Sequence, residues 1–363
     1  MADTVIEQHR FPCDTCGSDL RFDPSTGQMT CYHCGNTEPL SSGNARDISE
    51  LDFNAAIANA LDAAEMEETR VSTCPNCAAQ VAFDPDTHAA ECPFCATPVV
   101  TDTGTHRHIK PRAVLPFQIE ERAAKSRMTD WLGGLWFAPN GLQDYAKKGR
   151  ALSGIYVPHW TYDADTKTAY TGQRGTVYYE TRTVVRDGKR RQQRVAKTRW
   201  TGVRGRVARA FDDVLVLASS SLPRRYTERL APWDLSHLVP YSPEYLAGFR
   251  AEGYTVSLQD GFNDARAKMD AMITRDIRFD IGGDKQRITS AQTQVRDVTF
   301  KHILLPVWMA AYKYRGRTYR FVVNGQTGHV QGERPYSRAK IAVAVILGLL
   351  VAGALGYMFA LTQ

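Results

Sequence analysis

The sequence predicts an α+β protein made of two N-terminal zinc ribbons, a mixed β-rich body with packed helices, and one C-terminal transmembrane helix. Three observations lead to this prediction. All eight cysteines lie within the first 95 residues and form two sets of equal spacing, an uncharged run of 21 residues lies near the end of the chain, and the segment between them mixes strand-like alternation with helical stripes. With 43% hydrophobic and 23% charged residues, the chain has the composition of a globular protein.

Each cysteine set has the spacing C-x2-C-x14-C-x2-C, and the second set repeats the first 61 positions later. The repeat extends beyond the cysteines. Phe22-Asp23-Pro24 lies between the two Cys-x-x-Cys turns, or knuckles, of the first set, and Phe83-Asp84-Pro85 lies between those of the second set. A Cys-x-x-Cys turn directs two thiolates at one cation, and a hairpin brings a second turn opposite it, which completes the closed four-sulfur shell of structural zinc. We therefore predict two structural Zn²⁺ ions, held by Cys13, Cys16, Cys31 and Cys34, and by Cys74, Cys77, Cys92 and Cys95.

Two alternatives use the same residues: disulfides or redox-active dithiols, and an iron site of the rubredoxin type. An intact four-cysteine spacing that occurs twice favours zinc over both. Residues 1–12 include Asp3, Glu7 and Arg10 and have no apolar stretch of signal-peptide length, so we expect the cysteines to stay in the reducing cytosol. His33 lies inside a knuckle, and since four thiolates already complete the shell, we interpret it as a surface residue.

These features divide the chain into five segments. They are the first ribbon at 1–40, a linker helix at 41–70, the second ribbon at 71–110, the α+β body at 111–336 and the membrane anchor at 337–363. The linker prediction depends on Phe53, Ile57 and Leu61, which recur at four-residue spacing after Asp52, a residue type that caps helix N-termini. We expect this amphipathic helix to extend over 53–68 and to space or pack the ribbons.

A phrase recurs in the body, in which an apolar residue precedes proline and an apolar or aromatic residue follows it. It occurs at 114–117, 156–160 and 304–308, and the last two lead into strand-like alternation. Two related β units are therefore expected, with proline and tryptophan packing a core rather than lining a site. Apolar residues at helical spacing predict one helix within 119–136 and another over 262–277.

The run from Ile341 to Leu361 contains no charged residue. At 1.5 Å rise per residue, a helix of this length extends about 30 Å, the thickness of the bilayer's hydrocarbon core. Arg334, Arg338 and Lys340 precede it and mark the cytoplasmic side. We therefore expect a tail-anchored, single-pass protein of the cell inner membrane with the bulk of the chain on the cytoplasmic side, in preference to a buried soluble helix.

Small residues recur at every fourth position of this span. They are Ala344, Gly348, Ala352, Gly356 and Ala360. Such a pattern permits close approach of two helices, so a homo-oligomer is one interpretation and simple anchoring the other.

Charge is distributed unevenly along the chain. Up to Lys110, six lysines and arginines face seventeen aspartates and glutamates, whereas the remainder has thirty-nine bases against twenty-two acids. The ribbon module is thus acidic, and four thiolates on one Zn²⁺ add negative charge at each site. Zinc ribbons that hold nucleic acid need a cationic surface to displace counterions from phosphate, so this module is expected to repel nucleic acid. We interpret the ribbons as surfaces for recognition of a cytosolic protein.

The positive excess is concentrated in the segment 182–209, where eleven bases stand against a single acid. Strand-like alternation on both sides of Asp187-Gly188, a turn dipeptide, predicts a β-hairpin with a basic tip. Its role stays open between contact with a membrane or an acidic partner, including the protein's own ribbons, a merely solvated face, and nucleic-acid binding. The last would use Tyr178, Tyr179 and Trp200 to stack on bases.

Common catalytic motifs are absent from the sequence, which contains no G-x-x-x-x-G-K-[ST], H-E-x-x-H, G-x-S-x-G or G-x-G-x-x-G. Asp276, Asp280 and Asp284 surround a Gly-Gly turn, an arrangement more typical of caps and surface than of a metal or catalytic site. His159 and His302 lie beside the proline phrases and are interpreted as structural. We therefore predict that the protein is not an enzyme.

Four longer phrases accompany the ribbons, at Gly154–Trp160, Tyr245–Tyr254, Leu305–Trp308 and Asn324–Gly328. Together with the ribbons they resemble a family of bacterial membrane-anchored proteins with TFIIB-type zinc ribbons, and the resemblance covers nearly the whole chain. Members are often labelled primosomal protein N′ (replication factor Y)-like or superfamily II helicase-like, but this sequence has no phosphate-binding loop and is too short for two motor domains. The resemblance instead implies association with SPFH-type or phage-shock-type membrane-stress proteins.

We therefore expect a membrane-anchored zinc-ribbon adaptor or scaffold that presents a cytoplasmic domain to protein partners. The alternative is a nucleic-acid-binding accessory protein of replication, of the primosome or helicase-like kind. A third hypothesis, a membrane-associated enzyme built on Asp280 and Asp284, ranks last.

Overall fold

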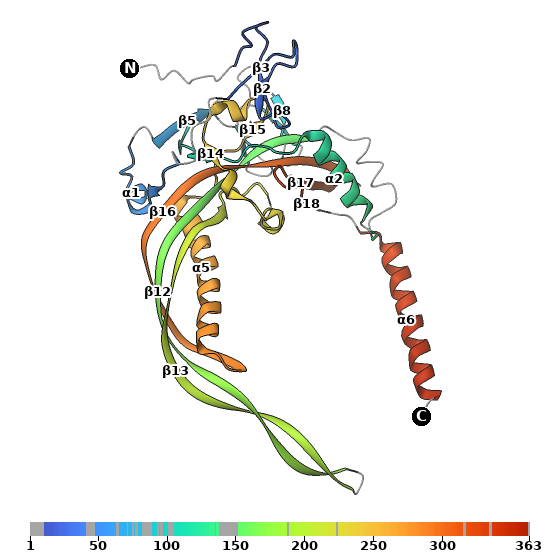
Figure 1. The fold of residues 1–363 in the computed structure, drawn as a ribbon. Coiled ribbons are helices and arrows are strands. Elements are labelled where there is room, and N and C mark those ends of the chain that lie inside the picture. Colours follow the sequence, from blue (N-terminus) through green and yellow to red (C-terminus); the bar gives the residue numbers. More distant parts are fainter. Residues whose placement is uncertain are drawn as a thin grey trace.

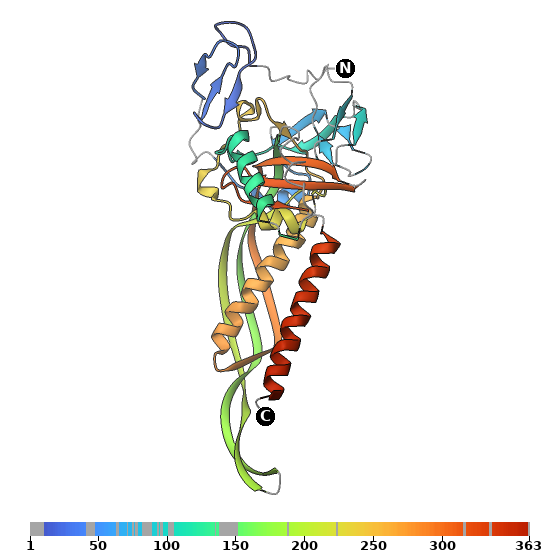
Figure 2. The ribbon, with the colours of Figure 1, turned by 90° about the vertical axis from the view of Figure 1, so that its right-hand side faces the viewer.

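The computed structural model shows a head of short strands and helices from which a long curved arm and one separate helix extend to the same side (Figures 1 and 2). The residues it describes are 11–40, 48–62, 65–70, 72–74, 76, 79–81, 89–92, 94, 97–100, 105–134, 136–137, 152–186, 189–222, 224–314, 317–333 and 336–361. The protein is thus of mixed α+β type, with a large curled sheet, few helices and one apolar C-terminal helix.

Three very long strands form the centre of the main sheet: β12 (Ser153–Arg186), β13 (Lys189–Leu217) and β16 (Lys285–Tyr314). Six shorter strands belong to the same nine-stranded sheet: β4 (Leu51–Asp52), β11 (Ala113–Val114), β14 (Val239–Pro240), β15 (Arg250–Ala251), β17 (Arg317–Asn324) and β18 (Val330–Gly332). The main order of the sheet is β13-β12-β16-β11-β14, and β4, β15, β17 and β18 lie off this path. All three long strands leave the head together and form the arm (Figure 1).

Helix α5 (Leu258–Ile281) lies along the concave side of the arm and gives its inner half a hydrophobic core (Figure 1). Alternate residues of β12 face this helix, and three aromatic residues among them, Trp160, Tyr162 and Tyr170, are buried. The predicted helical stripe supplies the other side of the core, because Ala265, Met269, Ile273 and Ile277 are all buried. Met272, an apolar residue within the predicted range 262–277, is 39% exposed and lies outside this core.

The three aspartates near the Gly-Gly turn tie the end of α5 to the arm. Asp276 accepts hydrogen bonds from Arg209 Nε and Nη2, both at 2.7 Å. Asp280 accepts a bond from the Tyr170 hydroxyl, and Asp284 accepts one from the backbone N–H of Val177 at 2.7 Å. Each carboxylate therefore has a structural partner.

Beyond the end of α5, the arm continues as the predicted basic hairpin. The ladder between β12 and β16 ends at the pair Gly175–Lys285, whereas β12 and β13 stay paired as far as Arg186 and Lys189. The hairpin prediction is confirmed, but the strands are far longer than the local alternation indicated.

In the head, two of the proline phrases lie on adjacent antiparallel strands. Tyr156 on β12 pairs with Pro306 on β16, and Pro158 pairs with Leu304. They belong to one sheet, so the expectation of two related β units is wrong. Their tryptophans do pack in the core as expected, and Trp308 donates a hydrogen bond to the carbonyl of Ile119, just before helix α2 (Glu121–Gly133).

Shorter helices complete the head. They are α4 (Arg224–Thr227), η3 (Glu228–Leu230), η4 (Leu235–His237) and η5 (Pro243–Leu246). Tyr226 of α4 and Leu230 of η3 pack in the cluster that contains Cys74 and Cys92, and Tyr245 of η5 contacts Phe22 of the first cysteine segment.

The linker helix is much shorter than the sequence predicted. Asp52 caps helix α1 by accepting a bond from Ala55 N at 2.6 Å, but α1 extends only over Phe53–Ile57. Asn59 has a φ of 54°, which ends the helix, and residues that the spacing placed in its last turns form strand β5 (Met66–Arg70) instead. β5 pairs with β10 (Thr105–Ile109), so a partner from beyond the second cysteine set overrides local helical periodicity.

Helix α6 (Arg338–Leu361) contains the predicted membrane span. Its segment Ala339–Phe359 has a mean hydropathy of 2.4 and is not buried against the described part of the chain. Apolar side chains project from it on all sides. In length and composition it matches a helix that crosses a bilayer once.

A buried lysine joins the arm to the head. Lys301 on β16 is 7% exposed, and its Nζ lies 2.8 Å from Glu50 Oε1, 2.8 Å from Asp213 Oδ1 and 3.7 Å from Asp163 Oδ2. Burial, and after it the neighbouring Glu50, raises the pKa of Asp163 to about 7. Three carboxyl groups thus share one ammonium group as their cation. The ammonium group therefore compensates a concentration of negative charge between β4, β12 and β13.

Replacement of Lys301 with methionine is expected to destabilise the protein by about 3 kcal/mol, because it keeps the side-chain volume but leaves the carboxylates without their cation. Chemical unfolding of the detergent-solubilised protein at pH 7 measures this difference. The matched control is Lys167→Met, an exposed lysine on the same sheet, which should change the free energy of unfolding by less than about 0.5 kcal/mol. Equal effects of the two substitutions would contradict the role assigned to Lys301.

Candidate metal centre

The first cysteine set lies on a small three-stranded sheet. Strands β1 (Arg21–Asp23), β2 (Gln28–Thr30) and β3 (Thr37–Glu38) pair in sequence order, and the cysteine knuckles precede β1 and follow β2. Each knuckle is closed by a glycine with positive φ, 72° at Gly17 and 77° at Gly35. Their N–H groups donate to the carbonyls of Cys13 and Cys31, both at 2.8 Å. These turns aim the sulfur atoms inward.

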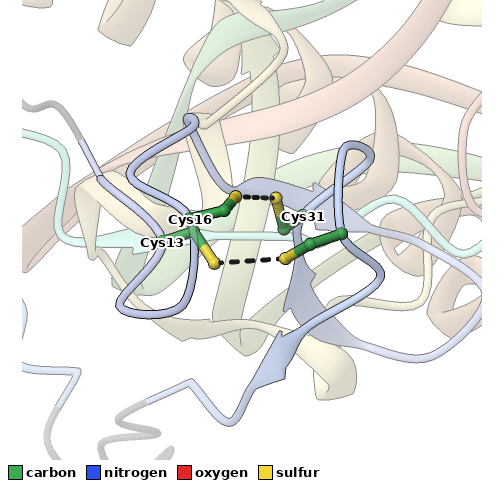
Figure 3. Close-up of side chains that lie close together, drawn as sticks. Cys13, Cys16 and Cys31 are labelled. Atoms are coloured by element: carbon green, nitrogen blue, oxygen red, sulfur yellow. Dashed lines mark hydrogen bonds between the residues drawn. The ribbon is translucent and has the colours of Figure 1, made fainter.

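The four sulfur atoms of this set converge on one point (Figure 3). Cys13 Sγ lies 3.6 Å from Cys34 Sγ, Cys16 Sγ lies 3.5 Å from Cys31 Sγ, and all four atoms lie within 4.8 Å of one another. Zinc bound to four thiolates at about 2.3 Å would place the sulfurs roughly 3.8 Å apart, whereas a disulfide needs about 2.05 Å. The cluster therefore fits one tetrahedral Zn²⁺ and does not have disulfide geometry.

Hydrogen bonds favour the thiolate form at two of these residues, Cys13 and Cys16, whereas desolvation and the neighbouring thiols raise the pKa of Cys34. The backbone N–H of Ser18, followed by the Ser18 hydroxyl, lowers the pKa of Cys16 to about 6. Asn36 Nδ2 approaches Cys13 Sγ at 3.6 Å and also donates to Glu38 Oε1 at 3.2 Å. Donors directed at sulfur favour thiolate, the form that binds zinc. His33 is exposed, as predicted for a residue outside the ligand shell.

The second cysteine set has the same backbone frame where the structure describes it. In the first set, the N–H of each leading cysteine donates to the carbonyl five residues later, from Cys13 to Ser18 at 2.7 Å and from Cys31 to Asn36 at 2.8 Å. Cys74 and Cys92 repeat this bond, to Ala79 at 2.9 Å and to Thr97 at 2.8 Å. Cys77 and Cys95, the other two predicted ligands, lie outside the described residues.

Short hairpins flank these two knuckles. They are formed by β6 (Ser72–Thr73) with β7 (Gln80–Val81), and by β8 (Ala89–Glu91) with β9 (Pro98–Val100). The duplication seen in the sequence is thus present in backbone geometry, although the ligand set itself is visible only for the first ribbon.

The first ribbon packs on the head through the segment 245–249. Phe22 lies between Tyr245 and Phe249, with ring centroids 5.4 Å and 6.4 Å away, and its N–H donates to the carbonyl of Ala247 at 3.0 Å. Gly248, with a φ of 86°, lets the chain pass close to Arg21, since an added Cβ would lie 3.1 Å from the side chain of that arginine. The ribbon is therefore a fixed part of the head.

The second cysteine set docks just downstream, on residues 252–253. Gly253 N donates to the carbonyl of Gln80 at 3.2 Å, and Cys74, Cys92 and Phe94 belong to one core cluster with residues of β12 and β16. Both cysteine modules therefore meet one short stretch of chain, which overlaps the phrase Tyr245–Tyr254. In the sequence, the segment Tyr245–Tyr254 could be noted only for its family resemblance. Its role in docking the cysteine modules depends on contacts with residues more than 150 positions away.

Glu252 is a buried acid within this docking surface that the sequence did not single out. Its carboxyl is 3% exposed and accepts a hydrogen bond from Ser219 Oγ at 2.7 Å. Burial raises the pKa of Glu252 to about 8, and the charge of nearby Cys92 contributes in the same direction. A carboxyl in such surroundings is largely protonated at neutral pH.

One end of the first ribbon stays open to solvent. Asp14, Cys16, His33 and Cys34 are all exposed there, and Tyr32 projects from the second knuckle with 69% of its surface accessible. The first ribbon as a whole lies on the side of the head away from the arm and α6 (Figure 2). An exposed aromatic residue among acidic and polar groups is typical of a protein-recognition surface.

Other candidate sites have structural explanations. Glu50, Asp163 and Asp212 lie close enough to hold a cation, but the Lys301 ammonium already pairs with the first two. His159 Nδ1 lies 3.0 Å from the carbonyl of Val157, and His302 Nδ1 lies 2.7 Å from that of Ile109, both in buried positions. The structural interpretation of the two histidines agrees with these contacts.

Comparison with known proteins gives one relative of similar length. The chain is 26% identical over 334 residues to the uncharacterized protein YdjG of Bacillus subtilis (strain 168), and the alignment covers 92% of each protein. The similarity therefore extends well beyond the cysteine knuckles. No family model and no solved structure matches the chain.

Proposed function

We propose that this protein is a membrane-anchored zinc-ribbon adaptor, whose first ribbon presents its knuckle end to a protein partner. The proposal is carried by the four-cysteine cluster, which would hold a small acidic module together around one zinc ion. Phe22 packs this module on the head, and Tyr32 stays exposed. Helix α6 would hold the head beside a bilayer. A rigid, prepositioned surface favours binding because little conformational entropy is lost when the partner docks.

The second cysteine set would hold a second structural zinc ion through Cys74, Cys77, Cys92 and Cys95. The repeated knuckle hydrogen bonds and the burial of Cys74 and Cys92 support this assignment. Four thiolates leave no open coordination position, so both ions would stabilise the fold and neither would supply chemistry to a substrate. This arrangement supports a scaffold rather than an enzyme.

The partner would be a cytosolic or membrane-associated protein, and the resemblance to TFIIB-type ribbon proteins suggests the SPFH or membrane-stress class. The bases that precede the uncharged run, Arg334, Arg338 and Lys340, support a cytoplasmic head on a single inner-membrane span. A replication accessory protein that binds nucleic acid through its ribbons receives less support, because acids outnumber bases in this module.

Capture of partners from solubilised membranes tests the proposal, with Tyr32→Ala as the decisive variant. Loss of an exposed aromatic anchor should weaken partner binding by about 2 kcal/mol, or roughly 30-fold, without loss of zinc. The matched control is Phe279→Ala, which removes a 90% exposed aromatic residue from α5. Equal recovery of the same partner by the protein, by Tyr32→Ala and by a variant lacking residues 1–40 would refute the adaptor role of this ribbon.

A further inference from the structure

The outer arm, residues 176–186 of β12 and 189–200 of β13, is a two-stranded ribbon without a covering helix among the described elements (Figure 1). Its paired length from residue 176 to residue 186 is about 35 Å at 3.3 Å per residue. An isolated two-stranded ribbon buries no core and is marginally stable on its own. A ribbon of this length therefore gains stability when a surface supports it.

The strand register places bases on both faces of the outer arm. Thr176 pairs with Arg199 and Tyr178 pairs with Lys197, so these residues share the face that continues the concave side. Arg194, opposite Thr181, projects from the other face. Either face can thus meet an anionic surface.

Aromatic rings support the arginines of this region. Arg199 lies 5.4 Å from the centroid of the Tyr178 ring, Arg194 lies 4.9 Å from that of Tyr179, and Arg287 of β16 lies 4.0 Å from that of Trp200. A guanidinium stacked on a ring is held flat while its N–H groups stay available to phosphate oxygens. Tyr179 is 60% exposed, so an amphipathic ring accompanies the charge.

The nearest polyanion depends on where the head is held. The arm and α6 extend from the same side of the head in both views, opposite to the first ribbon (Figures 1 and 2). Only residues 333–337 separate β18 from α6. In Figure 1 the outer arm reaches beyond the C-terminal end of α6, so contact with the near headgroup layer requires α6 to incline away from the arm. The span of α6 is not buried against the described part of the chain, and as a spanning helix it would tether the arm at the bilayer, at a high effective concentration.

The outer arm cannot enter the hydrocarbon beside α6. A charged side chain at the bilayer centre costs about 2.5 kcal/mol or more, and this hairpin carries many. In the headgroup layer the same charges are favourable, by about 1 kcal/mol for each lysine or arginine near anionic lipid, and tyrosine and tryptophan favour that depth.

We infer that the outer arm lies on the membrane surface and binds the phosphate groups of anionic phospholipids in the bilayer that holds α6. The hairpin lies within the headgroup layer, so that both of its faces meet phosphates. The stacked Arg194, with Tyr179, contacts them on one face, and the stacked Arg199, with Tyr178, contacts them on the other. The inference rests on the proposed membrane anchoring, but it is independent of the ribbon's partner.

Photo-crosslinking of the full chain in nanodiscs tests this inference. Benzoylphenylalanine in place of Tyr179 should form a lipid adduct in discs containing 30% phosphatidylglycerol, at least 10-fold more than in discs of phosphatidylcholine alone. The same group in place of Tyr32, on the opposite side of the head, should form little adduct in either disc. Combined substitution of Arg194→Gln and Arg199→Gln should reduce the adduct at position 179, while the thermal unfolding of the head stays unchanged.

Other outcomes overturn the inference, and each identifies a different occupant. Adduct formation with added single-stranded DNA at the expense of lipid would show that the arm binds nucleic acid, and adduct formation with residues 11–40 of a second copy would show that it binds the acidic ribbons. A lipid adduct that is independent of phosphatidylglycerol would exclude recognition of anionic phosphate. Failure of the chain to enter nanodiscs at all would instead refute the membrane anchoring, which separates the two proposals.

Discussion

Replacement of Cys31 with serine is expected to release the zinc ion of the first ribbon and to unfold residues 11–40. Cys31 is fully buried, and its sulfur lies 3.5 Å from Cys16 Sγ at the centre of the cluster. Structural zinc contributes on the order of 10 kcal/mol in ribbon-sized domains, far more than the small sheet β1–β3 could supply by itself. The fold of this ribbon therefore depends on the metal.

Two measurements check this result on the purified, solubilised chain. Elemental analysis should show one zinc ion fewer per chain, and trypsin should cleave faster at Arg21, an exposed residue that strand β1 holds in extended form while the ribbon is folded. His33→Ala is the matched control, since it alters the same knuckle but removes no thiolate and should keep the zinc content of the parent. Full zinc content in Cys31→Ser, or metal loss in His33→Ala, would show that the ligand set is assigned incorrectly.

The same substitution should also affect the head, because the ribbon and the body share one hydrophobic cluster. Phe22 packs on Tyr245 and Phe249, and Phe249 stacks in turn on Phe117 with ring centroids 4.4 Å apart. Loss of the ribbon exposes these rings. We expect chelation of zinc to lower the thermal stability of the body as well as that of the ribbon.

The metal cluster could be predicted from the sequence because its geometry is local. A Cys-x-x-Cys turn fixes the direction of two sulfurs within four residues, and Gly17 and Gly35 supply the positive φ that the turn requires. The apolar C-terminal helix could be predicted as well, since its length and apolar character need no partner within the protein. In both cases the chemistry of a short segment determines the structure.

The docking of the ribbons and the length of the arm could not be predicted in this way. Met66–Arg70 has helical periodicity in its surroundings, yet it forms a strand because Thr105–Ile109 lies beside it. Likewise β16, which begins 99 positions after the end of β12, decides how far the three-stranded part of the arm extends. Partners so distant in the chain leave no local signal.

Replacement of Glu252 with glutamine is expected to stabilise the protein at pH 8 by about 4 kcal/mol and to have little effect at pH 5. The folded state raises the pKa of Glu252 from 4.5 to about 8, chiefly through burial. Between these values the folded state binds the proton more tightly than the unfolded state, so stability is full below pH 4.5 and falls as pH rises toward 8. Glutamine is neutral at every pH and removes this loss.

The position of Glu252 makes this pH dependence a property of the ribbon docking surface. Its carboxyl lies beside Cys92, and a Zn(Cys)₄ site at the second ribbon would carry net negative charge that opposes ionisation further. Unfolding curves of the solubilised protein at pH 5, 6.5 and 8 should converge for Glu252→Gln and the parent at pH 5 and separate at pH 8. Glu228→Gln, an exposed glutamate on η3, should follow the parent throughout. If the difference in free energy of unfolding between Glu252→Gln and the parent were the same at all three pH values, Glu252 would ionise freely in the folded state. The second ribbon would then not cover it.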